Sequence, residues 1–115
     1  MSSTKPSPAD FLPLHPFELR ILLVLCEGKA HGYRIVKVIE ERDAGWKRIF
    51  PANLYRRLRE LLVAGLIVET EGPAEADDPR RRYFRVTSLG REVARLEARR
   101  LSELAADARW LLEGG

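Results

Sequence analysis

The sequence predicts a mainly helical fold that carries a small β-hairpin. Three segments between residues 16 and 64 repeat apolar side chains at helical spacing, and a glycine follows each of them. Two short apolar runs separated by turn-forming residues come next, before a last long segment returns to helical spacing. The 115 residues fit one domain, because two domains of typical size need a longer chain.

Three helices are expected before residue 65, after a flexible tail. Residues 1–13 are rich in serine and proline, a composition that favours a disordered chain end. The first helix is expected at about residues 16–27, where Pro16 suits a first helical position that needs no N–H. The second is expected at about residues 31–43. The third is expected at about residues 51–64, where an i, i+4, i+7, i+8 stripe is formed by Leu54, Leu58, Leu61 and Leu62.

The next two segments predict a β-hairpin with a long tip. Residues 66–71 and 81–86 are short runs that contain β-branched and aromatic side chains, which favour strands. The segment between them, residues 72–80, includes the turn formers Gly72, Pro73 and Pro79. The same segment is acidic, with Glu75, Asp77 and Asp78.

A long helix is expected to follow, from a Thr87 cap to about residue 112. Its apolar stripe continues well beyond the length that a small three-helix core can cover. A second copy of the chain is the simplest partner for this stripe, and packing against the first helix of the same chain is the alternative. We expect residues 88–113 to form a C-terminal dimerisation helix, with an interface made by Leu101, Leu104, Ala108 and Leu111.

The order of helices, hairpin and long helix is typical of a winged helix-turn-helix, which we expect over residues 14–87. The charges fit this fold, because the cations gather in two segments. Residues 46–59 hold five cations and no acid, and residues 80–85 hold four cations and no acid. In a winged helix both segments lie on one side of the molecule, where the third helix can enter the major groove of DNA and the hairpin can reach the adjacent backbone.

Duplex DNA is therefore the expected partner, because cations on this side would neutralise phosphates and release counterions. A two-fold dimer would present two recognition helices to a pseudo-palindromic site. The expected DNA-contacting residues are Lys47, Arg48, Asn53, Tyr55, Arg56, Arg57, Arg59, Arg81 and Arg82.

Other functional classes have less support in the sequence. The acidic hairpin tip would be repelled by phosphate, so the alternative is a winged helix that docks a partner protein and does not bind DNA. The chain has two histidines and one cysteine, at spacings that predict no metal site. The absence of a glycine-rich phosphate loop and of a nucleophile–base pair predicts neither a cofactor nor an enzyme. We expect a cytoplasmic protein without membrane contact, because no signal sequence or membrane-length apolar run is visible.

Several short motifs resemble the PadR-like transcriptional regulators. These motifs are His31-Gly32-Tyr33, Asn53-Leu54-Tyr55, Gly65-Leu66-Ile67, Arg82-Tyr83-Phe84-Arg85-Val86-Thr87 and Gly90-Arg91. The resemblance covers about residues 14–112 and is to the smaller subfamily, which has a single C-terminal helix. It implies a winged helix-turn-helix dimer that is joined through the last helix and usually acts as a repressor.

The resemblance also implies a small aromatic ligand, because such molecules release some family members from DNA. Certain members place a tryptophan on the last helix, at the centre of the dimer, to stack against flat ligands. The matching position in this chain is Leu101, and Trp110 lies nine residues later, about half a turn around a continuous helix. The sequence therefore departs from the family pattern at the position where such ligands stack.

Overall fold

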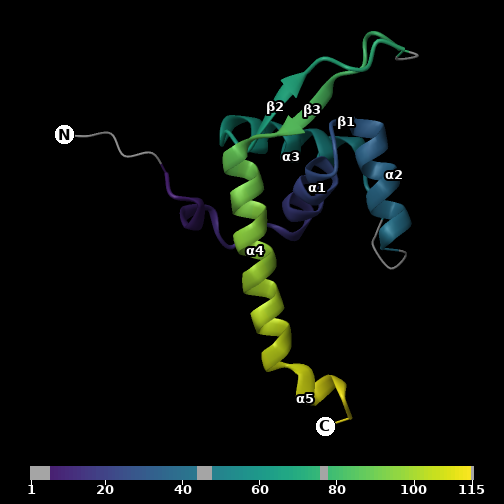
Figure 1. Ribbon diagram of the computed structural model, residues 1–115. Coiled ribbons are helices and arrows are strands. Elements are labelled where there is room, and N and C mark those ends of the chain that lie inside the picture. Colours follow the sequence, from purple (N-terminus) through teal and green to yellow (C-terminus); the bar gives the residue numbers. More distant parts are fainter. Residues whose placement is uncertain (1–5, 44–47, 76–77, 115) are drawn as a thin grey trace, which may run out of the picture.

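The computed structural model describes residues 6–43, 48–75 and 78–114, and its main elements follow the expected order (Figure 1). The elements are η1 (Pro8–Phe11), α1 (Pro16–Cys26), β1 (Ala30–His31), α2 (Gly32–Arg42), α3 (Pro51–Val63), β2 (Ile67–Thr70), β3 (Tyr83–Val86), α4 (Ser88–Asp107) and α5 (Arg109–Leu112). The predicted fold, mainly helical with a small β-hairpin, is confirmed. The three helices before the hairpin begin and end within one residue of their predicted bounds.

Side-chain caps fix where three of the helices begin. His15 and His31 each accept, through Nδ1, the backbone N–H of a residue in the helix that follows, both at 3.1 Å. Thr87 Oγ1 accepts the N–H of Gly90 at 3.0 Å. Each bond satisfies an N–H that has no partner inside the first helical turn. The starts of α1, α2 and α4 are thus set by polar residues just outside the helices.

The three strands form one antiparallel sheet in the order β1-β3-β2. The hairpin pairs Glu69 with Phe84 and Val68 with Arg85. Successive side chains of β3 point to opposite faces of the sheet, so Phe84 is buried and Arg85 is exposed. Strand β1 pairs with the other edge of β3, through Ala30 opposite Phe84. The sequence pattern did not predict β1, because two residues are too few to show the alternation of a strand.

One hydrophobic core joins α1, α2, α3, the sheet and the first turns of α4. Among its most deeply buried side chains are Ile21, Leu22, Ile35, Leu58, Leu61, Ile67, Phe84 and Val93. A Cβ on Gly90 would lie 2.0 Å from the carbonyl oxygen of Leu66, so α4 begins in direct contact with the start of the hairpin. This close approach fixes the direction in which α4 leaves the domain.

Part of the segment expected to be a flexible tail packs on α4. The 3-10 helix η1 lies beside α4, and Leu14 donates its backbone N–H to Glu97 Oε2 at 2.9 Å. Glu97 is only 1% exposed, and Arg100 donates to the same carboxylate through Nε at 2.6 Å and Nη2 at 3.0 Å. The guanidinium of Arg100 holds the pKa of Glu97 below its usual value. A buried charged group thus ties residues near the N-terminus to the middle of α4.

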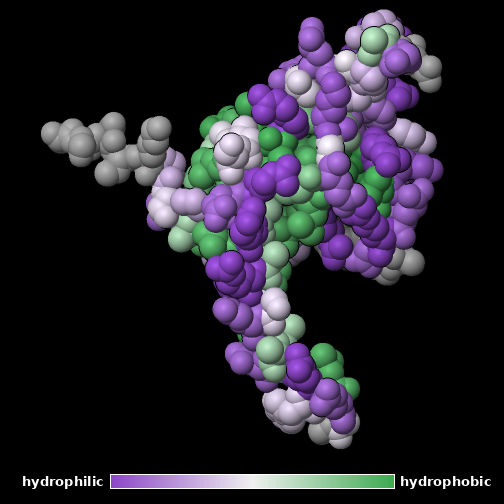
Figure 2. All heavy atoms as spheres, viewed as in Figure 1, coloured by the Kyte–Doolittle hydropathy of each residue, from purple (hydrophilic) through white to green (hydrophobic). Residues whose placement is uncertain are grey.

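The rest of α4 projects away from the domain, and its residues from 98 to 107 are exposed (Figure 1). The long helix expected to continue to about residue 112 is interrupted at Ala108, whose φ of −95° and ψ of 2° end α4 before the short helix α5. Figure 2 shows hydrophobic side chains gathered over α1, in the angle between α1 and α4, and again on α5.

Candidate nucleic-acid interface

Helix α3 has one face in the core and one face open to solvent. Leu54, Leu58 and Leu61 are buried, at exposures of 3%, 2% and 1%. The opposite face, where residues three and four apart lie above one another, is exposed along its length and carries Ala52, Tyr55, Arg56, Arg59 and Val63. Tyr55 and Val63 are among the exposed large apolar side chains of the chain. The exposed face of α3 therefore carries two cations and an aromatic hydroxyl.

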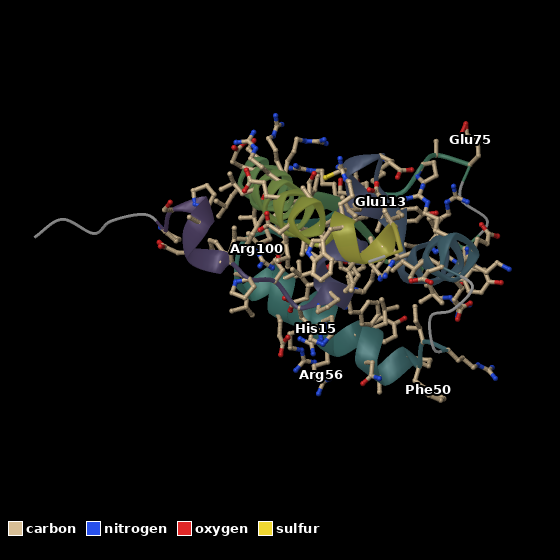
Figure 3. The ribbon with its side chains drawn as sticks, turned by 90° about the horizontal axis from the view of Figure 1, so that it is seen from below. His15, Phe50, Arg56, Glu75, Arg100 and Glu113 are labelled. Carbon is tan, nitrogen blue, oxygen red and sulfur yellow. The ribbon has the colours of Figure 1, made fainter. Side chains whose placement is uncertain are left out.

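The first turn of α3 borders a basic hollow of about 310 Å³. Three arginines line this hollow: Arg48, Arg56 and Arg57. The other lining residues are His15, Phe17, Ile49, Phe50 and Asn53. Burial lowers the pKa of His15, and the positive charges of Arg57 and Arg56 lower it further. Figure 3 shows His15, Phe50 and Arg56 along the same edge of the molecule, away from Glu75. The hollow therefore presents positive charge beside the exposed face of α3.

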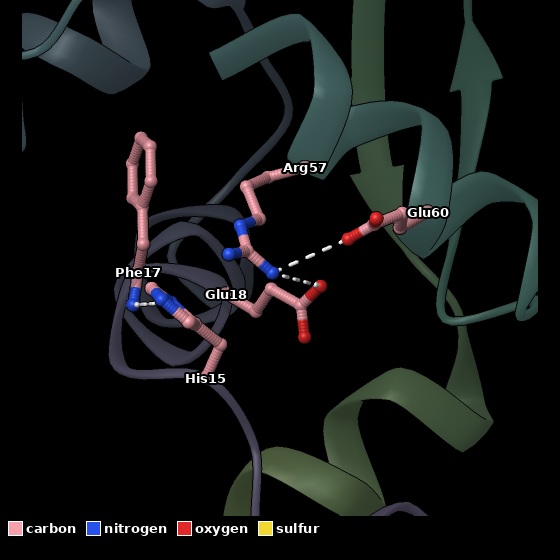
Figure 4. Close-up of polar contacts among 5 residues, drawn as sticks. All are labelled: His15, Phe17, Glu18, Arg57 and Glu60. Carbon is pink, nitrogen blue, oxygen red and sulfur yellow. Dashed lines mark hydrogen bonds and ion pairs between the residues drawn. The ribbon is translucent and has the colours of Figure 1, made fainter. Parts of the chain in front are cut away.

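Arg57 occupies a different environment from its neighbour Arg56. Its Nη1 lies 3.5 Å from Glu18 Oε2 on α1 and 3.3 Å from Glu60 Oε1 on α3 (Figure 4). Its side chain is 18% exposed. Burial raises the pKa of Glu18, although the charge of Arg57 opposes that rise. Arg57 thus links α3 to α1 within the chain, and its expected contact with DNA stays a prediction.

The loop end of the hairpin, just before β3, brings a second group of cations towards the start of α3. A hollow of about 300 Å³ lies between the start of α2, the hairpin and Tyr55, and it is lined by Arg80, Arg81 and Arg82. Arg81 Nη1 lies 2.9 Å from His31 Nε2, and its guanidinium lies 5.8 Å from the ring centre of Tyr33. Burial lowers the pKa of His31, and the charges of Arg81 and Arg34 add to this effect.

His31 and Tyr33 belong to this arrangement, although neither residue was among those predicted to contact DNA. The His31 ring packs edge-on against Tyr83 of β3, with the two ring centres 5.1 Å apart. One imidazole therefore caps α2 and contacts both β3 and Arg81. The sequence signal was the aromatic content of the His31-Gly32-Tyr33 motif, whose contact with the hairpin depends on the fold.

Apart from Arg57 and Lys47, the sequence-predicted residues lie in three places. Exposed on or beside α3 are Arg48, Asn53, Tyr55, Arg56 and Arg59, while Arg81 and Arg82 are exposed at the hairpin. Lys47 lies outside the described residues. The residues predicted for a dimer interface lie apart from these, on α4 and α5, where Leu101, Leu104 and Leu111 are exposed and Ala108 is half-buried.

Across residues 6–43, 48–75 and 78–114, no three or more His, Cys, Asp or Glu side chains gather as they would around a metal ion. None of the helices in these ranges has both the length and the apolar character needed to cross a bilayer.

Comparison with known proteins gives the family. Residues 21–96 match the family described as "Transcriptional regulator PadR-like family". No curated protein matches the chain. A PadR family transcription regulator from Clostridium difficile superposes with a TM-score of 0.73 at 19% identity, covering 85% of this chain and 99% of that chain.

Two more solved structures share the fold. A transcriptional regulator from Clostridium thermocellum has a TM-score of 0.64 at 24% identity, covering 85% of this chain and 88% of its own. H. salinarum RosR has a TM-score of 0.68 at 27% identity, covering 90% of this chain and 91% of its own. Since the family match covers well over half of the residues, the chain belongs to the PadR-like family of transcriptional regulators, which bind DNA through a winged helix.

Proposed function

We propose that the protein binds a pseudo-palindromic DNA site as a homodimer and represses transcription there. The observation that carries this proposal is the placement of the exposed face of α3 beside the arginines that precede β3 at the loop end of the hairpin. A helix of this kind can enter the major groove, and a hairpin beside it can reach the adjacent phosphates.

We assign base contacts to the start of α3. Arg56 lies on the exposed face, and Asn53 borders the basic hollow next to it. Arginine can form two hydrogen bonds with guanine, and asparagine can do the same with adenine. Tyr55 can donate its hydroxyl to a phosphate at the side of α3 that faces the hairpin.

We assign phosphate contacts to the cations around that centre. Four of them are exposed in the described part of the chain: Arg48, Arg59, Arg81 and Arg82. Lys47 is a further candidate. The four exposed arginines of each protomer would give about eight contacts in a dimer, which predicts that log K falls with log salt at a slope of about −7. Arg57 would instead hold α3 against α1, because Glu18 and Glu60 surround its guanidinium.

A second copy of the chain is the proposed partner of the exposed apolar side chains of α4 and α5. Leu101, Leu104 and Leu111 are 38%, 56% and 56% exposed. Leu23 of α1 adds to them, because it is 41% exposed and lines a hollow together with Leu101 of α4. A two-fold interface would cover this surface and place two α3 helices on one DNA site.

We also propose that a small aromatic molecule releases the protein from DNA. The support is Trp110, which is 66% exposed on α5. The half-turn offset between Leu101 and Trp110 assumed one continuous helix, and the interruption at Ala108 removes that assumption. In a Trp46→Phe variant, where Trp110 is the one remaining tryptophan, fluorescence measured with and without an aromatic carboxylic acid should report binding at this end of the molecule.

Selection from a random duplex library at near-physiological salt tests the main proposal. Enrichment of an inverted repeat is the expected result, because two-fold symmetry in the protein requires matching half-sites. A salt titration on the enriched duplex should then give the steep slope stated above. Weak binding without sequence preference would contradict the proposal and favour a winged helix that docks a partner protein.

A further inference from the structure

An acidic side chain of the hairpin holds one of its arginines. Glu69 on β2 accepts two hydrogen bonds from Arg82, which lies just before β3: Oε2 from Nε at 3.2 Å and Oε1 from Nη2 at 3.0 Å. A guanidinium uses the same pair of parallel N–H groups to bind a phosphate. In the free protein, a carboxylate therefore occupies the donors that a DNA phosphate would need.

Arg82 lies where such a phosphate is expected. It borders the hollow of about 300 Å³ that also contains Arg81 and Tyr55. It also borders a hollow of about 480 Å³ that runs along α3 to Arg59 and Val63. Arg82 thus stands between the hairpin and the exposed face of α3.

The pair is open to exchange with a ligand. The side chains of Arg82 and Glu69 are 54% and 50% exposed, so water screens their attraction. Hydrogen bonds from Arg82 hold the pKa of Glu69 below its usual value, which keeps this carboxylate ionised at neutral pH. An ion pair as exposed as that of Arg82 and Glu69 can form in the free protein and can still be displaced by a phosphate.

We propose that Glu69 sets DNA affinity by competing with the phosphate backbone for Arg82. The inference rests on the proposed DNA binding and adds a residue that weakens it. Binding requires Arg82 to leave Glu69, so the free energy of the ion pair opposes association. The competition acts on every DNA sequence, because a phosphate contact carries no base information.

The test compares Glu69→Gln with Glu71→Gln in the full-length protein. Both variants remove one negative charge from the same strand region, so both reduce general repulsion of DNA. Glu71 is a matched control, because its backbone carbonyl oxygen accepts the hydrogen bond from Lys29 Nζ, and this bond survives the change. Since exposed ion pairs are weak, Glu69→Gln should tighten binding to a random-sequence duplex by about two- to fivefold more than Glu71→Gln does.

A double-mutant cycle with Arg82→Ala shows whether the effect passes through Arg82. In the Arg82→Ala background, Glu69→Gln should have no more effect than Glu71→Gln. Two results would overturn the inference and leave the proposed function intact. In one, Glu69→Gln still tightens DNA binding more than Glu71→Gln does when Arg82 is absent. In the other, the two variants tighten binding equally in the wild-type background. If neither wild type nor Glu69→Gln bound DNA, both proposals would fall.

Discussion

The buried carboxylate of Glu97 allows a quantitative test of how the N-terminal segment is held. Glu97→Ala removes the acceptor of the Leu14 N–H and of two N–H groups of Arg100. A hydrogen bond to a charged group contributes about 1.5–3 kcal/mol when it is shielded from water. The bonds to Arg100 contribute less, because that side chain is 43% exposed.

The substitution also removes one buried methylene group, which contributes about 0.8 kcal/mol. The wild type already incurs a cost for burying the charge, which offsets part of these gains. We therefore expect Glu97→Ala to lower the free energy of unfolding by about 2–4 kcal/mol. Urea unfolding at one fixed protomer concentration measures this difference. A loss below about 0.5 kcal/mol, the size typical of surface changes, would refute the packing of the segment on α4.

The pH dependence supplies a control with Glu97→Gln, which keeps the shape of the side chain and removes its charge. The folded pKa of Glu97 lies below its unfolded value, which is about 4.3. Its charge therefore stabilises the fold above about pH 4.3, and this contribution is lost as the pH falls through the lower folded pKa. Wild type should be more stable than Glu97→Gln at pH 7, and the difference should shrink in acid. A constant difference would show that the charge is not responsible.

Three further substitutions test the rest of the account. Arg56→Ala should weaken binding to the selected site by about 1–3 kcal/mol and scarcely affect random DNA, as compared by fluorescence anisotropy; an equal loss on all sequences would make Arg56 a phosphate contact. Leu104→Glu should convert dimers to monomers on a sizing column, because it places a charge among exposed apolar side chains; an unchanged dimer would remove α4 from the interface. Gly90→Ala should lower the thermal midpoint, because the Cβ would lie 2.0 Å from the carbonyl oxygen of Leu66; an unchanged midpoint would contradict this close packing.

Local signals explain why the helices of the domain could be predicted. The leucine stripe of α3 fixed its buried face, and Pro51 stands at its first position. Pro16 marks the first position of α1 in the same way. Each of these signals lies within the helix that it defines, so it can be recognised from the sequence without knowledge of tertiary contacts.

Features that depend on contacts between distant residues could not be predicted. Strand β1 forms because Ala30 pairs with Phe84. The 3-10 helix η1 packs on α4 near the buried carboxylate of Glu97, and the sequence pattern does not distinguish Glu97 from an acid on the surface. The interruption at Ala108 follows a run of good helix formers, so propensity gave no warning of it.

The candidate site shows the same limit. Arg56 and Arg57 are neighbours in an acid-free segment, and the charge pattern predicts a role in DNA binding for both. Successive residues of a helix point about 100° apart, which turns Arg57 towards Glu18 and leaves Arg56 in solvent. Charge alone cannot separate the two, because the position of α1 decides which arginine finds a carboxylate.

The ratio of two dissociation constants tests the central claim most directly. The protein is titrated onto its selected inverted repeat and onto a scrambled duplex of the same composition, both at near-physiological salt. If α3 reads base edges in two half-sites, the selected duplex should bind at least about 10³-fold more tightly. Equal dissociation constants for the two duplexes would contradict the proposal that this protein is a sequence-specific regulator.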